Sequence, residues 1–163
     1  MAKLGTLTRA IGVITSGTIA ADETITVAGK VYTFVAAPSA AGDVDLGADD
    51  DESLDNLAKA INLSGTAGTE YDTDMVVNEH VTAVSVGDGA TVNVIAKMPG
   101  VVGGFIPIAE STTGATVDAT LGAGTAGAGN PSTAIAVILD TMQLNSEVIA
   151  ALDKLDASAS AGV

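Results

Sequence analysis

The chain has 163 residues, of which 20 are acidic and six are basic, so its formal net charge is −14, and it contains no cysteine. Because like charges repel, such an acidic surface argues against nucleic acid or an anionic membrane as a partner, and the lack of cysteine excludes disulfides and thiolate chemistry. Only two Tyr and two Phe stand beside 19 Gly, a composition that favours strands and turns of small side chains in one domain, with at most an appendage.

Residues 1–21 are expected to form an N-terminal arm or a first strand. They hold two of the six bases, Lys3 and Arg9, among apolar residues such as Leu4 and Leu7. An ordinary edge strand and an arm that docks on a partner both fit this pattern, and in the second case these four residues are the candidate contacts. The segment lacks the continuous apolar run of a secretory signal, so we expect a protein made in a cytoplasm.

A hairpin followed by a helix is predicted for residues 24–63. Thr and apolar residues alternate over 24–27, which is the pattern of a half-buried strand, and the apolar run 31–35 predicts a second strand. Between them, Ala28-Gly29 predicts a two-residue turn, because Gly adopts a positive φ without strain. Apolar residues at helical spacing then predict one buried helix face, formed by Leu54, Leu57, Ala58 and Ile61.

An acidic loop lies between the hairpin and the helix. Its carboxylates are candidate calcium ligands, namely Asp43, Asp45, Asp49, Asp50 and Asp51. Their spacing does not match that of an EF-hand loop. The alternative is that acids just before a helix satisfy its free N–H groups and its positive dipole end, and this interpretation fits the spacing better.

The rest of the core is expected to be β-structure. Residues 81–86 and 91–96 flank a Gly-Asp-Gly turn and predict a second hairpin. A turn-rich crossing follows over 97–104, then a short strand over 105–109 that Pro107 confines to an edge or a bulge, and a weak strand over 115–121. The sequence thus predicts an α+β core domain over 22–121: a small, mostly antiparallel sheet of two hairpins plus short strands, with one packed helix.

The C-terminal part changes character. Residues 122–130 read as a Gly-rich linker, and Asn130-Pro131 is a good helix start. The predicted helix 131–157 carries a heptad seam made of Ile135, Ile138, Met142, Asn145, Ile149 and Leu152. This helix either packs back onto its own domain or associates with other copies, most simply as a trimer. Residues 158–163 form a small-residue tail.

No catalytic constellation is recognisable in the sequence. His80 is the single histidine and has no Ser, Cys or paired acid at a familiar spacing. Few aromatic residues are present to line a substrate pocket. We therefore expect a protein that is not an enzyme and that needs no cofactor.

Five segments resemble, in order, a module of the virion structural proteins of tailed bacteriophages. They are TITVAGKVYTFV (24–35), VDLG (44–47), SLDNLAKAIN (53–62), VTA (81–83) and AKMPG (96–100). In the module, an x-V-x-G-x-x-Y-x-F hairpin, an I/L-G step, an L-x-x-L-x-x-A-I-N helix and a K-x-x-G loop recur in this order. The resemblance covers about residues 18–110. Gly103-Gly104 departs from it, because the family often has Gly-Asn there.

This resemblance implies a structural role in a virion assembled in the host cytoplasm. A capsid decoration (cement) or head-fibre protein fits best, and a tail or neck protein is the alternative. The implied partners are the major capsid protein, or another virion protein, and further copies of the chain, with a trimer favoured. A calcium-dependent binding module is the alternative from another class.

Overall fold

The computed structural model describes residues 8–87 and 90–122. The chain divides into two units, Met1–Ala128 and Gly129–Val163, and every described residue belongs to the first. Three of the candidate arm contacts lie outside the described residues, namely Lys3, Leu4 and Leu7. The predicted helix 131–157, the tail 158–163 and the whole heptad seam also lie outside them, which removes Ile135, Ile138, Met142, Asn145, Ile149 and Leu152 from the description.

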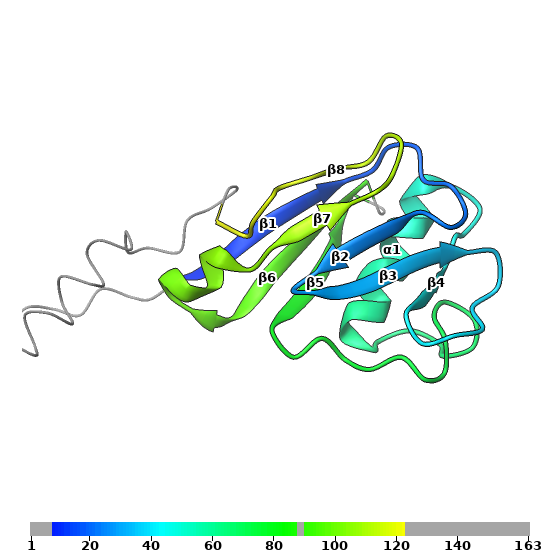
Figure 1. Cartoon of the computed structure of the whole chain (residues 1–163), viewed down its shortest axis with the longest axis horizontal. Coiled ribbons are helices and arrows are strands. Elements are labelled where there is room, and N and C mark those ends of the chain that lie inside the picture. The colour runs from blue at the N-terminus through cyan, green and yellow to red at the C-terminus, as the bar shows by residue number, and fades with distance from the viewer. Residues whose placement is uncertain (1–7, 88–89, 123–163) are drawn as a thin grey trace, which may run out of the picture. The chain divides into compact units, whose positions relative to one another are not determined.

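The described part is α+β, as predicted, but its strands form two four-stranded sheets rather than one (Figure 1). Sheet A has the strand order β5-β6-β1-β8, and its strands are Val81–Val86, Thr91–Pro99, Arg9–Thr15 and Thr116–Val117. Sheet B has the order β4-β3-β2-β7, and its strands are Asp43–Asp45, Lys30–Val35, Thr24–Val27 and Ile108–Glu110. The helix α1 spans Asp50–Asn62, and the 3-10 helix η1 spans Val101–Phe105. All strand pairs are antiparallel except β3 with β4.

The first predicted hairpin is present as β2 and β3. Ala28 and Gly29 both have positive φ, 56° and 78°, as the tight turn between two twisted strands requires. The two strands pair from Thr24 opposite Thr33 to Val27 opposite Lys30. The second predicted hairpin is also present, as β5 and β6, although β6 runs on to Pro99.

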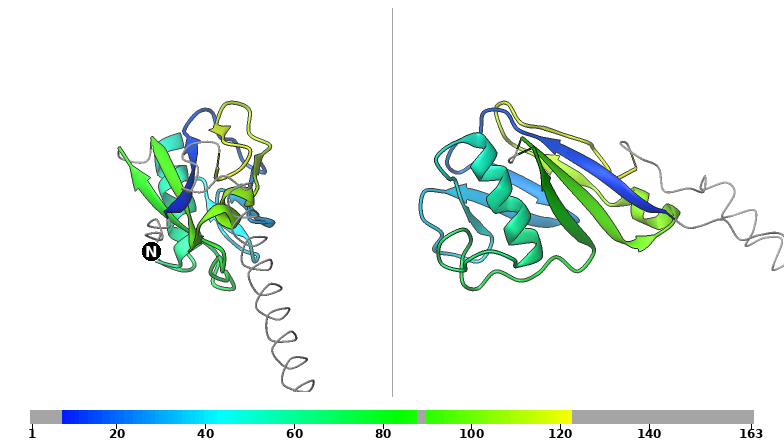
Figure 2. Two further views of the ribbon diagram at one scale, coloured as in Figure 1. Left: turned by 90° about the vertical axis from the view of Figure 1, so that its left-hand side faces the viewer. Right: turned by 180° about the vertical axis from the view of Figure 1, so that it is seen from behind.

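The two sheets and the helix form two layers. Figures 1 and 2 show sheet B on one side and sheet A with α1 beside β5 on the other. Between the layers lies one hydrophobic core, whose largest fully buried side chains come from both sheets and the helix, among them Tyr32, Phe34, Ile14, Ile25, Leu54 and Leu57. The predicted apolar face of the helix therefore points into the core, as its spacing indicated.

The helix begins at Asp50, so some of the acids expected just before it belong to its first turn. Asp49 is the N-cap, and its side chain accepts a 2.8 Å hydrogen bond from the backbone N–H of Glu52. Asp50, Asp51 and Glu52 form the acidic first turn, where they favour the positive end of the helix dipole. Leu63 ends the helix in a left-handed conformation, with φ 52°.

The N-terminal strand differs from expectation. A first strand, one of the two expectations for residues 1–21, is present as β1, but it lies inside sheet A, between β6 and β8, so it is not an edge strand. The partners of β1 are more than 70 residues away along the chain, at Ile95 and Val117 for example, so local pattern could not reveal them. A second difference concerns residues 105–109, which were expected to form one short strand. Phe105 instead ends η1, and the strand there is β7, at the edge of sheet B.

Candidate binding surfaces

The acidic loop has a structural role in turns and at the helix start. Four of the five candidate ligands accept backbone hydrogen bonds: Asp43 from Ser39 and Ala40, Asp45 from Gly47, Asp49 from Glu52, and Asp50 from Ile19. Asp51 lies in the first turn of α1. Among the described residues, no three His, Cys, Asp or Glu side chains come together in a way that could hold a metal ion. The interpretation of these acids as caps is therefore the one the geometry favours.

The motif residues of the resemblance hold the fold together. Asn62 at the end of α1 binds Ala83 of β5 twice, donating to its carbonyl at 2.6 Å and accepting from its N–H at 3.0 Å. Lys97 donates to the carbonyl of Asn78 at 2.6 Å, and the Asn78 amide donates to the Tyr32 hydroxyl at 3.3 Å. The side chains common to the module thus make structural contacts, and function must be sought on surfaces.

Asn78 is a central residue that sequence reasoning missed. It is buried, although it lies in the irregular connection 64–80. Its N–H donates to Ile61, its side-chain amide also donates to the carbonyl of Val27, and its side-chain oxygen accepts from the N–H of His80. One residue therefore ties the helix end, both strands of the first hairpin, β6 and the start of β5.

The first candidate surface is the outer face of sheet A. It consists of three cross-strand rows, Thr82–Ile95–Ile11, Val84–Asn93–Val13 and Val86–Thr91–Thr15, and we call these nine residues the sheet A face. Their neighbours along each strand are buried in the core, except for the half-buried Ser85, so this set faces away from the core. The rear view in Figure 2 shows the strands of sheet A beside α1, without another described element over them.

The sheet A face carries no charge, in a chain whose formal net charge is −14. Five of its nine residues are Val or Ile, and Val84 and Val86 are 49% and 46% exposed. Asp118 lies beside its margin, but that carboxylate accepts a 2.9 Å hydrogen bond from the N–H of Val13. A surface whose nine residues carry no charge, and more than half of which are Val or Ile, is a place where another protein can approach this acidic chain with little repulsion.

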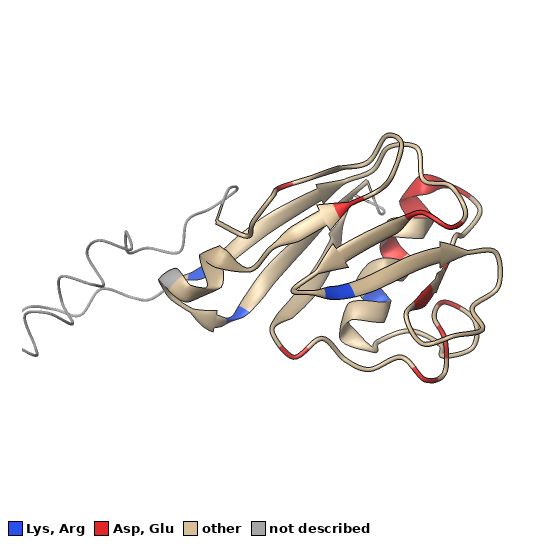
Figure 3. Cartoon of the chain, viewed as in Figure 1, with Lys and Arg blue, Asp and Glu red and all other residues tan. Residues whose placement is uncertain are grey.

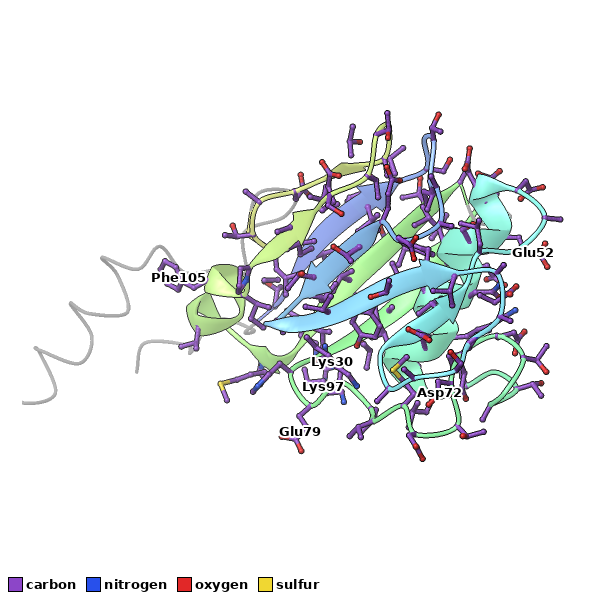
Figure 4. All side chains as sticks on the ribbon, turned by 45° about the vertical axis from the view of Figure 1, so that its right-hand side comes forward. Lys30, Glu52, Asp72, Glu79, Lys97 and Phe105 are labelled. Carbon is purple, nitrogen blue, oxygen red and sulfur yellow. The ribbon has the colours of Figure 1, made fainter. Side chains whose placement is uncertain are left out.

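The second candidate surface surrounds η1. The four most exposed large apolar side chains of the described part are Val102, Phe105, Val76 and Met98, at 67%, 65%, 63% and 61%. All four line a group of three shallow hollows, of about 380, 350 and 390 Å³. His80 lines every one of the three hollows, so they adjoin each other. We call the four side chains and His80 the η1 end, and in Figure 4 Phe105 points away from the sheets there.

Charge divides the described part into two ends (Figure 3). Acidic residues gather over the loops around the start of α1 and over the connection that follows it. Arg9 and Lys97 lie in β1 and β6, the two strands that contact η1, and the exposed Glu79 is the acid that lines the hollows. Arg9 is the candidate arm contact that the structure describes. It is exposed and pairs with Pro99, beside the η1 end.

Lys30 contributes a further cation beside the η1 end. Its Nζ is shielded from solvent without a hydrogen-bond partner and lies 5.6 Å from the centroid of the Tyr32 ring. Burial lowers the pKa of Lys30, and burial raises the pKa of the Tyr32 hydroxyl. Lys30 and Lys97 each line one of the three hollows, and both are labelled in Figure 4.

These surfaces offer apolar contact and charge rather than reactive groups. His80 is exposed and has its backbone N–H bound to Asn78. Among the helices that the structure describes, none is long and apolar enough to cross a membrane. No family model, curated protein or solved structure matches the chain. The arguments about function therefore rest on the surfaces and on the motif resemblance.

Proposed function

We propose that the chain is a structural component of a tailed-phage virion, of the capsid decoration (cement) or head-fibre kind, which binds the outer capsid and stabilises it. The observation that carries the proposal is the uncharged, apolar sheet A face on a chain with a net charge of −14. Such a face lets a protein lie flat on a large shell without bringing its own carboxylates against the shell. The role is mechanical and involves no catalysis.

The area of the sheet A face determines how strongly one copy can bind through it. Each residue on one face of a sheet covers about 33 Å², from a strand spacing of about 4.8 Å and a two-residue repeat of about 6.8 Å, so nine residues cover about 300 Å². A stable interface buries about 800 Å² on each partner. One copy therefore binds weakly through this face alone, and several linked copies bind firmly through avidity.

The basic residues beside the face favour an acidic or neutral partner. Arg9 and Lys97 lie at the end of sheet A that contacts η1, where they attract acidic groups of a shell. The acidic loops around α1 keep the remaining surface repulsive toward other acidic proteins, and this orients the bound molecule.

Binding to capsids tests the proposal. Capsids prepared without this protein, from the phage genome that encodes it, are sedimented with the purified full chain. We expect saturable binding that Val84→Glu weakens at least tenfold. Val31→Glu is the matched control, because Val31 is also 49% exposed but lies on sheet B. Absence of binding, or equal weakening by both variants, would refute the proposal.

Two further observations separate the alternatives. A calcium chelator should leave capsid binding unchanged, whereas loss of binding would favour the calcium-dependent module. Immunolabelling of intact particles should mark the heads. Labels on the tail or neck would favour the second virion role, and particles without label would overturn a virion role altogether.

A further inference from the structure

Both ends of the described core leave it beside η1. The N–H of Gly100 donates to the carbonyl of Thr8 at 2.9 Å, and the N–H of Gly122 donates to the carbonyl of Gly104 at 3.2 Å. Gly104 and Gly122 are so close that a Cβ on Gly122 would lie 3.0 Å from the Gly104 oxygen. The described part therefore ends, at Gly122, beside η1 and its exposed apolar side chains.

The η1 end is the most exposed apolar surface of the described residues. Val76, Met98, Val102 and Phe105 are each more than 60% exposed, and the other exposed large apolar side chains reach at most 49%. Because these four line adjoining hollows, they form one patch and are not isolated surface residues. Such a patch on a monomer costs solubility, so it calls for an occupant.

We propose that the occupant is a second copy of this chain, and that the η1 ends of several copies meet around a symmetry axis. The heptad seam predicted within residues 131–157 favours association of copies. The composition of residues 123–130 predicts a Gly-rich linker, and a flexible chain of eight residues has an r.m.s. length of about 15 Å. Association through the predicted seam would therefore bring the η1 ends of neighbouring copies close to one another.

Charge supports the choice of a second copy. Acidic loops would repel one another if copies met around the start of α1. At the η1 end, the acid Glu79 lines the same hollow as the base Lys97, so copies that meet there bring both signs together. In a closed ring the contact is between unlike sides of neighbouring copies, which allows an acid of one copy to face a base of the next.

Single introduced cysteines test this contact directly, because the chain has none of its own. Full-length Phe105→Cys is treated with a short bis-maleimide cross-linker in the absence of any capsid. We expect a cross-linked dimer on a denaturing gel. Val86→Cys is the matched control: Val86 is 46% exposed but pairs with Thr91, at the opposite end of sheet A, and it should cross-link at least fivefold less. Equal or absent cross-linking of the two variants overturns the proposal.

A second experiment measures the energetic effect. Light scattering over a concentration series should show that the full chain self-associates and that Phe105→Glu raises the dissociation constant at least tenfold. Val86→Glu adds the same charge and should change it less than threefold. The thermal unfolding of both variants at low concentration should match that of the original chain. A full chain that remains monomeric, or an equal effect of the two substitutions, would also refute the proposal. Neither experiment depends on capsid binding, so this inference and the proposed function can fail separately.

Discussion

Replacement of Asn78 should destabilise the domain more than its position in an irregular connection suggests. The side chain makes three hydrogen bonds: it donates to the Val27 carbonyl at 3.1 Å and to the Tyr32 hydroxyl at 3.3 Å, and it accepts from the His80 N–H at 3.1 Å. Asn78 is 3% exposed, and both Val27 and Tyr32 are fully buried. Asn78→Ala removes all three bonds at once.

The expected loss follows from the groups left without a partner. Each buried polar group that loses its hydrogen bond costs about 1–3 kcal/mol. The Val27 carbonyl and the Tyr32 hydroxyl are buried and the His80 N–H is nearer the surface, so Asn78→Ala should cost about 3–4 kcal/mol. That is a large fraction of the about 5–15 kcal/mol that stabilises a typical domain. Asn78→Leu, which has a branched side chain without polar atoms, should cost as much, because the loss comes from hydrogen bonds and not from volume.

Urea unfolding of the full chain, followed by tyrosine fluorescence, measures the effect. With a slope of about 1.5–2 kcal/mol per M, the midpoint should fall by about 2 M. Asn93→Ala is the matched control, because Asn93 is half-buried on the sheet A face and its side chain makes no hydrogen bond within the described residues; it should cost about 0.5 kcal/mol or less. If Asn78→Ala falls within about 0.5 kcal/mol of that control, the hydrogen bonds of Asn78 are not what holds the connection in place.

Three smaller changes test local features in the same unfolding assay. Ala28 has a φ of 56°, so Ala28→Asn, which tolerates this conformation, should raise the free energy of unfolding by about 1 kcal/mol, and no gain would argue against strain in the turn. Lys30→Met removes an amine that is shielded without a hydrogen bond, and it should stabilise the domain by about 1 kcal/mol at neutral pH. Burial lowers the pKa of Lys30, so the original chain gains stability as the pH rises toward the ordinary value of 10.5, and the advantage of the variant should shrink there. The hydrogen bond from Lys59 lowers the pKa of Glu70, so Glu70→Gln should cost about 1 kcal/mol at neutral pH, and the difference should vanish as the pH falls below the ordinary value of 4.5, because the original carboxylate then takes up its proton. A difference that persists in acid would mean that the ion pair is not its source.

The elements that local pattern describes well were predictable from the sequence. The two hairpins and the helix of the described part each depend on contacts within about 16 residues, such as Ile25 with Tyr32 or Val81 with Ala96. The division into two sheets was not predictable, because it depends on distant pairs such as Ile14 with Val117 and Val27 with Ile108. Nothing in the neighbourhood of these residues along the chain encodes the choice.

The candidate surfaces were even less accessible to sequence reasoning. Phe105 was expected in a strand, where alternation puts a side chain either in the core or in solvent. It lies instead at the end of η1, and its side chain is exposed to solvent. The sheet A face becomes visible only once β1, β5 and β6 are known to lie side by side, since its nine residues come from three separate segments. Asn78 looked like one polar residue in a polar connection. Of its five hydrogen-bond partners, His80 lies in the same connection, and the other four come from α1, β2, β3 and β6.

The surroundings of β5 hinder association through backbone hydrogen bonds but allow association through side chains. An exposed edge strand offers free backbone groups to any other strand and so invites aggregation. At this edge, Asn62 occupies both the N–H and the carbonyl of Ala83, which blocks the addition of a strand in the middle of β5. The side chains of Val84 and Val86 on the adjoining face remain exposed. The hydrogen bonds of Asn62 thus hinder unspecific pairing of β5 with a strand of another molecule. Association through the exposed side chains remains possible, and there the shape and charge of the two surfaces select the partner. That combination is expected of a protein that must stay soluble alone and attach at one defined place.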